Sequence, residues 1–259
     1  MPTLLRTERV SYSHDGLPLE GYAAFDPALP WPRPGVLLCH MWKGLVPFVE
    51  ERARALAALG YVAFALDLYG RGVRPKTTEQ ASREMGRLVG DIPLLRARAR
   101  AGLARLADSP LVRGCEVAAL GYCFGGGVAL ELARDGADLA AAISFHGLLD
   151  TPRRATRGAV QARVLAFHGV LDPMVSEEHV RAFQSEMEDA GADWQLVVYG
   201  RAGHGFTNYE LPRDPRGGLF YEPDADRRSW AGATALLREA LGDPATRGPR
   251  GRRRPRGRR

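Results

Sequence analysis

The sequence predicts an α/β fold, with a mostly parallel central sheet that is covered by helices on both faces. Short apolar runs alternate with longer amphipathic segments, which is the pattern of parallel strands connected by helices. The apolar runs are typical of strands that are buried on both faces. No internal repeat complicates this order. With 259 residues, 45% of them hydrophobic, the chain can form one large domain, which we predict over residues 1–242.

A β-hairpin is predicted to precede the alternating part. Residues 3–13 and 17–25 are its strands, because Asp15-Gly16 between them is a strong signal for a hairpin turn. A proline-rich connection over residues 26–34 follows. The remaining strands are predicted at residues 35–40, 61–66, 115–120, 139–145, 163–167 and 194–199.

The helices are predicted from apolar residues at spacings of three and four and from residues that begin or end helices. Gly60 ends the first of them, Pro93 is expected to separate two others, and Ser176 is a residue type that caps helix N-termini. The predicted helices span residues 46–59, 78–90, 94–107, 125–134, 177–190 and 226–241.

The composition argues against several classes of protein. Three cysteines are too few for a disulfide scaffold, and no CxxC pair indicates a zinc ribbon. No run of about 18 apolar residues is present that would span a membrane. Arg6, Glu8 and Arg9 stand where a signal peptide would need an apolar core, so we expect a cytoplasmic protein.

The positive net charge comes from the C-terminal segment. Residues 243–259 hold eight Arg and one Asp, a balance of +7, which leaves −1 of the total +6 for residues 1–242. Because this segment has almost no apolar side chain, it cannot offset its ordering entropy and is predicted to be a disordered tail. It could bind nucleic acid, anionic lipid or an acidic protein. It lacks aromatic residues that would stack on bases, so we do not expect sequence-specific nucleic-acid recognition.

The most informative segment is Gly121-Tyr122-Cys123-Phe124-Gly125, between a predicted strand and a predicted helix. Its pattern, G-x-C-x-G, is the cysteine form of the nucleophile elbow, in which small residues let strand and helix approach. Cys123 would stand at a helix N-terminus, where the helix dipole favours a thiolate, and the amide of Phe124 would point at a developing oxyanion. The alternative is a glycine-rich turn with a buried structural cysteine.

Two later residues favour the catalytic interpretation. Asp172 follows the predicted strand 163–167, and His204 follows the predicted strand 194–199. Both fall just past a strand end, where open α/β sheets place their functional groups. The order nucleophile, acid, histidine is that of the α/β-hydrolases. Each residue alone has a structural interpretation, such as a turn for Asp172, but together with Cys123 they predict a catalytic triad.

The segments GYCFGGG, LDP and GHGF, with GYVAFALDLYGRG upstream, resemble the dienelactone hydrolase family over residues 10–241. The resemblance implies an α/β-hydrolase fold and the hydrolysis of a small ester, lactone or thioester through an acyl-cysteine intermediate. It implies Cys123 as nucleophile, His204 as base and then acid, and Asp172 as the residue that orients the imidazole. It also implies an oxyanion hole made by the backbone amides of Trp42 and Phe124.

Two positions depart from the family pattern. Many members have a glutamate that pairs with the cysteine, where this chain has Met41, which cannot accept a proton. Cys123 would then depend on its histidine and on the helix terminus for activation, and turnover would be weak or the substrate would differ. Asn208 stands where the dienelactone enzymes have a carboxylate-binding arginine. We therefore predict a small ester, lactone or thioester, bound next to Met41 and Phe206, rather than dienelactone itself.

Other residues and partners have simpler interpretations. His40, His146 and His168 each stand at a predicted strand end, where they could line the pocket, but structural hydrogen bonds are the simpler role and their spacing matches no metal motif. We expect no metal and no other cofactor, a small-molecule ester or lactone as the partner, and a monomer or small homo-oligomer. The alternative function is a catalytically weak hydrolase-fold protein that binds partners through its basic tail.

Overall fold

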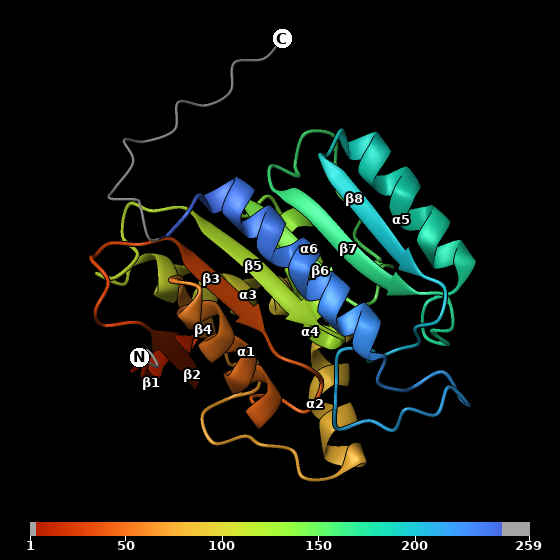
Figure 1. The fold of residues 1–259 in the computed structure, drawn as a ribbon, viewed down its shortest axis with the longest axis horizontal. Coiled ribbons are helices and arrows are strands. Elements are labelled where there is room, and N and C mark those ends of the chain that lie inside the picture. Colours follow the sequence, from red (N-terminus) through yellow and green to blue (C-terminus); the bar gives the residue numbers. More distant parts are fainter. Residues whose placement is uncertain (1–3, 245–259) are drawn as a thin grey trace.

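The computed structural model describes residues 4–244 (Figure 1), so most of the predicted tail over residues 243–259 lies outside the described residues. The strands are β1 Arg6–His14, β2 Leu17–Phe25, β3 Gly35–Cys39, β4 Val62–Ala65, β5 Val117–Tyr122, β6 Ala141–Phe145, β7 Arg163–Gly169 and β8 Trp194–Tyr199. The helices are α1 Pro47–Ala58, α2 Thr78–Val89, α3 Ile92–Ala107, α4 Phe124–Arg134, α5 Glu177–Ala190 and α6 Pro223–Leu241.

The arrangement of the strands confirms the predicted fold class. Within the described part of the chain they form one eight-stranded sheet in the order β1-β2-β4-β3-β5-β6-β7-β8. The hairpin strands β1 and β2 are antiparallel, and β2 joins the sheet antiparallel to β4. All neighbours from β4 to β8 are parallel. The carboxyl ends of β3 and β5 to β8 therefore meet at one edge, where loops can combine residues from distant parts of the chain.

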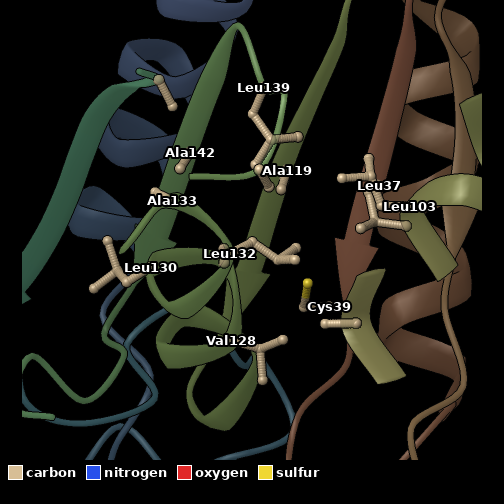
Figure 2. Close-up of a cluster of buried hydrophobic side chains, with 14 of the residues drawn as sticks. Leu37, Cys39, Leu103, Ala119, Val128, Leu130, Leu132, Ala133, Leu139 and Ala142 are labelled. Atoms are coloured by element: carbon tan, nitrogen blue, oxygen red, sulfur yellow. The ribbon is translucent and has the colours of Figure 1, made fainter. Parts of the chain in front are cut away.

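Both faces of the parallel strands are buried, as their apolar sequences predict. On β3, Leu37 and Cys39 belong to one cluster of buried side chains and Val36 and Leu38 belong to another, because successive side chains point to opposite faces of a sheet. Helices α2 to α5 supply side chains to the first cluster, which Figure 2 shows around α4, and α1 and α6 supply the second. Among residues 4–244, no helix is both long enough and apolar enough to cross a membrane.

The boundary between α2 and α3 differs from the prediction. Pro93 does not separate the two helices but lies in the first turn of α3, which begins at Ile92. Proline is tolerated there because the first N–H groups of a helix have no intrahelical acceptor. Asp91 caps α3 by accepting a hydrogen bond from the N–H of Leu94. The break is therefore made by Gly90 and Asp91.

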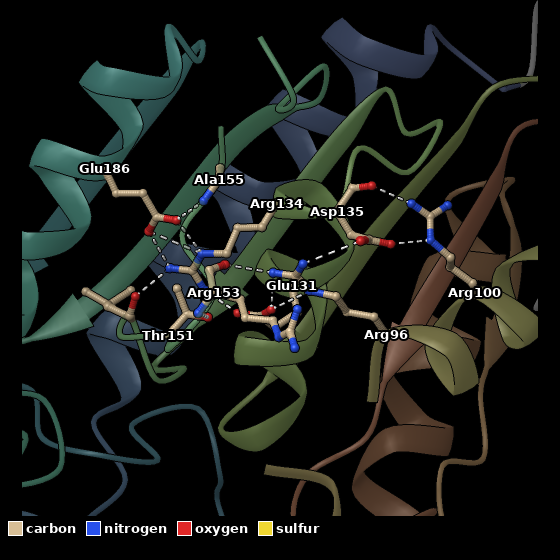
Figure 3. Close-up of polar contacts among 10 residues, drawn as sticks. Arg96, Arg100, Glu131, Arg134, Asp135, Thr151, Arg153, Ala155 and Glu186 are labelled. Atoms are coloured by element: carbon tan, nitrogen blue, oxygen red, sulfur yellow. Dashed lines mark hydrogen bonds and ion pairs between the residues drawn. The ribbon is translucent and has the colours of Figure 1, made fainter. Parts of the chain in front are cut away.

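Buried charged side chains connect α4 with α5 and α3 (Figure 3). Arg134 of α4 is almost completely buried, and its Nη1 lies 2.9 Å from Oε1 of Glu131. Its Nη2 lies 2.9 Å from Oε2 of Glu186 on α5. Arg96 of α3 pairs with Glu131 from the other side, at 2.7 Å. We call Glu131, Arg134 and Glu186 the ion-pair cluster. It lies at the C-terminal end of α4 and fixes how that helix packs.

Candidate active site

Cys123 occupies the single position between β5 and α4. Strand β5 continues to Tyr122, two residues beyond the predicted end, and α4 begins at Phe124. The backbone of Cys123 has φ 55° and ψ −122°. A positive φ costs a residue with a Cβ about 1–3 kcal/mol and is found most often at functional sites. The turn leaves Cys123 partly exposed at the carboxyl edge of the sheet.

The glycines of the motif have a steric cause. A Cβ on Gly121 would overlap the carbonyl oxygen of Gly125, and a Cβ on Gly125 would overlap the carbonyl oxygen of Cys39. The first turn of α4 therefore lies directly against the ends of β5 and β3. This close approach also brings the segment that follows β3, including Trp42, to the same edge as Cys123.

Three predicted side chains come together at this edge. Nε2 of His204 lies 3.1 Å from Sγ of Cys123, and Nδ1 of the same ring lies 2.9 Å from Oδ2 of Asp172. Asp172 lies in the loop after β7 and His204 in the loop after β8. We call these residues the Cys–His–Asp cluster. A thiol, an imidazole and a carboxylate in this order allow a proton to pass between sulfur and ring while the carboxylate orients the ring.

The backbone around the cluster holds the imidazole and the carboxylate in place. His204 is 3% exposed and Asp172 is 5% exposed. The N–H of His204 donates to the carbonyl of Gly218 at 2.7 Å, and Oδ1 of Asp172 accepts from the N–H of Met174 at 2.8 Å. Cys123 is thus the one residue of the cluster that is not buried.

The surroundings of His204 favour the protonated form of its ring. Burial by itself lowers the pKa of the ring, but the hydrogen bonds to Asp172 and Cys123 outweigh that effect and raise the pKa to about 10. A protonated imidazole 3.1 Å from a sulfur stabilises the thiolate form of that sulfur electrostatically. The arrangement therefore suits a thiolate–imidazolium pair.

The two residues predicted for the oxyanion hole lie at the start of α4 and in the segment after β3. Phe124 is the first residue of α4, and Trp42 packs, like Cys123, against both core clusters. Among residues 4–244 neither backbone N–H has a protein acceptor. Backbone N–H groups without a protein acceptor are available to bind a developing oxyanion, so the role of these two residues stays a prediction.

Met41 and Phe206, which we predicted to bind substrate, are both buried. Met41 is 7% exposed and belongs to the same core cluster as Phe206. Cys123 packs against this cluster. Phe206 is fully buried, and its ring lies edge-on to those of His146 and Tyr199, with centroids 5.0 Å and 5.5 Å apart. Both residues therefore shape the surroundings of the cluster, and their contact with substrate stays a prediction.

Of the three histidines predicted at strand ends, His40 and His146 have hydrogen-bond partners of the kind that the structural interpretation predicts, whereas the buried Nδ1 of His168 has no such partner within the described residues. Nε2 of His146 lies 2.8 Å from Oγ1 of Thr207. Nδ1 of His40 lies 2.7 Å from the carbonyl oxygen of Met41. Within the described residues, no three His, Cys, Asp or Glu side chains are grouped so that they could hold a metal ion.

Comparison with known proteins identifies close relatives. The model of the dienelactone hydrolase family matches residues 19–241. A solved structure named m3DLH is 38% identical, with a TM-score of 0.86, and the match covers 92% of this chain and 99% of that chain. A dienelactone hydrolase-like promiscuous phosphotriesterase from metagenomic libraries is 36% identical, with the same TM-score and coverage. A Bradyrhizobium protein named "Probable 2-oxo-3-(5-oxofuran-2-ylidene)propanoate lactonase" is 25% identical over 79% of this chain and 83% of that protein.

Proposed function

Because the chain belongs to the dienelactone hydrolase family and is therefore a lactone or ester hydrolase, we propose that it cleaves a small ester, lactone or thioester by acyl transfer to Cys123. The observation that carries the proposal is the pair of contacts made by one ring: Nε2 of His204 to the sulfur and Nδ1 to Asp172. This geometry gives the sulfur a proton acceptor whose orientation is fixed.

In the first step the sulfur attacks the substrate carbonyl carbon, and its proton resides on Nε2 of His204. The carbonyl oxygen becomes negative and accepts hydrogen bonds from the backbone amides of Trp42 and Phe124. Loss of one such donor typically slows acyl transfer by about 100–1000-fold. The bond to the leaving oxygen then breaks, His204 donates its proton to that oxygen, and the acyl group remains on Cys123 as a thioester.

In the second step water attacks the thioester carbon. His204 takes a proton from the water and returns it to the sulfur as the carbon–sulfur bond breaks. The carboxylate of Asp172 orients the ring and stabilises its positive charge in both steps. When the substrate is a lactone, the leaving oxygen stays tethered to the acyl group, so the product is a single hydroxy acid.

The 36% identity to a structure described as a promiscuous phosphotriesterase supports a second class of substrate. In this reaction the sulfur attacks phosphorus, the leaving alkoxide or phenoxide takes the proton of His204, and water then breaks the phosphorus–sulfur bond. The same cluster would serve both reactions, so Cys123→Ala should abolish turnover of paraoxon together with that of esters.

The test compares two thiols of the same chain. Wild type, Cys123→Ala and Cys115→Ala are assayed with p-nitrophenyl acetate and with a small lactone, and the quenched wild type is analysed by peptide mass spectrometry. We expect Cys115→Ala, which changes a partly buried thiol elsewhere, to keep full activity. Cys123→Ala should lose turnover, and one acetyl group should be found on Cys123.

Activity that survives in Cys123→Ala would refute the proposed mechanism. A variant without residues 243–259 should turn over like the wild type if the basic segment has no part in the reaction. Loss of activity in that variant would instead favour a role for the segment in substrate binding.

A further inference from the structure

We propose that His40 is a positioning residue of the oxyanion hole, and that its Nδ1–H holds the Met41–Trp42 peptide with the N–H of Trp42 turned toward the substrate carbonyl. The inference rests on the proposed function, because it concerns the same acyl transfer. It assigns a role to a buried ring that never touches the substrate.

The hydrogen-bond partners of His40 determine where its proton resides. Nε2 lies 3.2 Å from the backbone nitrogen of Leu68, which carries a hydrogen and can only donate. Nδ1 lies 2.7 Å from the carbonyl oxygen of Met41, which can only accept. The ring must therefore accept at Nε2 and donate at Nδ1. Complete burial lowers the pKa of His40, which keeps the ring in this neutral form.

The acceptor of this hydrogen bond belongs to the peptide unit that carries the N–H of Trp42. In a trans peptide the C=O and the N–H point in opposite directions within one plane, so a fixed oxygen also fixes the direction of the N–H. The oxygen of Met41 accepts a second hydrogen bond, at 2.9 Å, from the N–H of Gly44. Both of its lone pairs are thus engaged, and donation to the oxygen also polarises the N–H on the other side.

A second contact holds the next peptide unit. The hydroxyl of Tyr69 donates to the carbonyl oxygen of Trp42 at 2.7 Å. The ring of Tyr69 lies edge-on to His40, with centroids 4.7 Å apart, and stacks on Phe124 at 6.3 Å. His40 and Tyr69 therefore connect the segment after β3 to the residue that supplies the other oxyanion donor.

The position of this segment relative to the nucleophile is fixed by backbone packing. Gly125 lies so close to the end of β3 that a Cβ there would overlap the carbonyl oxygen of Cys39 and would lie 2.7 Å from that of His40. Because β3 cannot shift at this point, it cannot move to accommodate a rotated Met41–Trp42 peptide. The ring of His40, together with the N–H of Gly44, then selects one orientation of this peptide.

Two substitutions separate the two nitrogens of the ring. The amide of His40→Asn can replace Nδ1 as the donor to Met41, whereas the amide of His40→Gln reaches the position of Nε2 and leaves that donor out. We expect His40→Gln to lower kcat for p-nitrophenyl acetate by about 10–100-fold with KM nearly unchanged, which is less than the loss of a whole oxyanion donor. His40→Asn should keep kcat within about threefold of wild type, because the donor is retained.

Alkylation of Cys123 by iodoacetamide distinguishes this role from a merely structural one. If His40 only supported the fold, its substitution would change the alkylation rate as well as the rate of hydrolysis. Alkylation needs the Cys123 thiolate but forms no oxyanion, so its rate should be the same in wild type and in both variants. Equal kcat values in the two variants, or a parallel fall of alkylation and hydrolysis, would overturn the proposal. These outcomes differ from failure of the proposed function, in which Cys123→Ala itself stays active.

The wild type offers a test that does not depend on the folding of a variant. Nitrogen chemical shifts of the His40 ring should show the hydrogen on Nδ1 at neutral pH. A hydrogen on Nε2, or on both nitrogens, would overturn the proposal even if both variants were unstable.

Discussion

The two ends of α4 both carry contacts between ionisable groups, but they differ in how completely those groups are satisfied. At the N-terminal end the sulfur of Cys123 has one hydrogen-bond partner among the described residues, Nε2 of His204, and Cys123 is partly exposed. At the C-terminal end every nitrogen of Arg134 is engaged. Its partners are Glu131, both carboxylate oxygens of Glu186 and the carbonyl of Leu149.

This difference separates a group that can react from one that cannot. An arginine stays protonated at any pH a protein experiences, so Arg134 has no proton to transfer. A thiol and an imidazole can share a proton, and Cys123 is partly exposed. Buried charge alone therefore does not indicate chemistry; an unsatisfied, accessible atom next to a movable proton does.

The largest expected effect comes from changing which nitrogen of the His204 ring carries the hydrogen. In Asp172→Asn, an amide N–H can donate to Nδ1 of His204, which would leave the hydrogen on Nε2 facing the sulfur. Such a ring cannot take the proton of the thiol, so we expect kcat to fall by about 10000-fold, or ~5 kcal/mol. Steady-state kinetics on p-nitrophenyl acetate measures this fall. Asp150→Asn, at an exposed aspartate, is the matched control, and a rate within tenfold of wild type would contradict the assigned role.

Breaking the ion-pair cluster should lower the free energy of unfolding without lowering kcat. Arg134→Met leaves the carboxylate of Glu186, which is 2% exposed, without its cation. Removing one partner of a buried ion pair costs about 3–5 kcal/mol, which denaturant unfolding measures, while kcat of the folded enzyme should stay unchanged. The control is Arg181→Met, which breaks an exposed pair with Glu177 and should cost less than about 0.5 kcal/mol. Equal losses in the two variants would contradict the argument.

Much of this architecture could be predicted from the sequence, because local rules determine it. The predicted bounds of α5 and β8 agree with the structure, and Ser176 caps α5 as its residue type indicates. The elbow and the two loops of the Cys–His–Asp cluster were predictable because residue order and strand ends are both visible in a single chain. The contacts at 3.1 Å and 2.9 Å bring the predicted residues together.

The ion-pair cluster and the role of His40 could not be predicted in this way. Charged residues are expected at the surface, yet Glu131 and Arg134 lie on a helix that is buried on nearly all sides. The sequence did contain one indication of this ion pair: Glu131 and Arg134 are three residues apart in an otherwise apolar segment. For His40 the decisive partner is a backbone N–H 28 residues away, at Leu68, and a backbone group leaves no trace in the residue types.

A smaller effect tests whether the sulfur contributes to the charge of His204. The hydrogen bond to Cys123 and the charge of that residue both raise the pKa of the ring, so Cys123→Ala should lower it from about 10. NMR titration of the ring measures the change, and Cys115→Ala is the control. Because the pKa is raised on folding, the protonated ring stabilises the protein fully below pH 6.5, and this contribution is lost as the pH rises toward 10. The wild type should therefore lose more stability over this range than Cys123→Ala, and parallel stability curves would contradict this coupling.

The smallest expected effect comes from giving the N-terminal end of α4 a second carboxylate, as the C-terminal end already has. Met41 lies in the core cluster against which Cys123 packs, so Met41→Glu would place an acidic group in these apolar surroundings. A new acceptor for the thiol proton would change the acid limb of the pH–rate profile. The rate should change by less than about tenfold, because His204 already serves as a proton acceptor. Met41→Gln separates the effect of charge from that of shape. If wild type, Met41→Glu and Met41→Gln have the same profile, position 41 has no part in activating Cys123, and the imidazole alone accounts for the reactivity of this end of the helix.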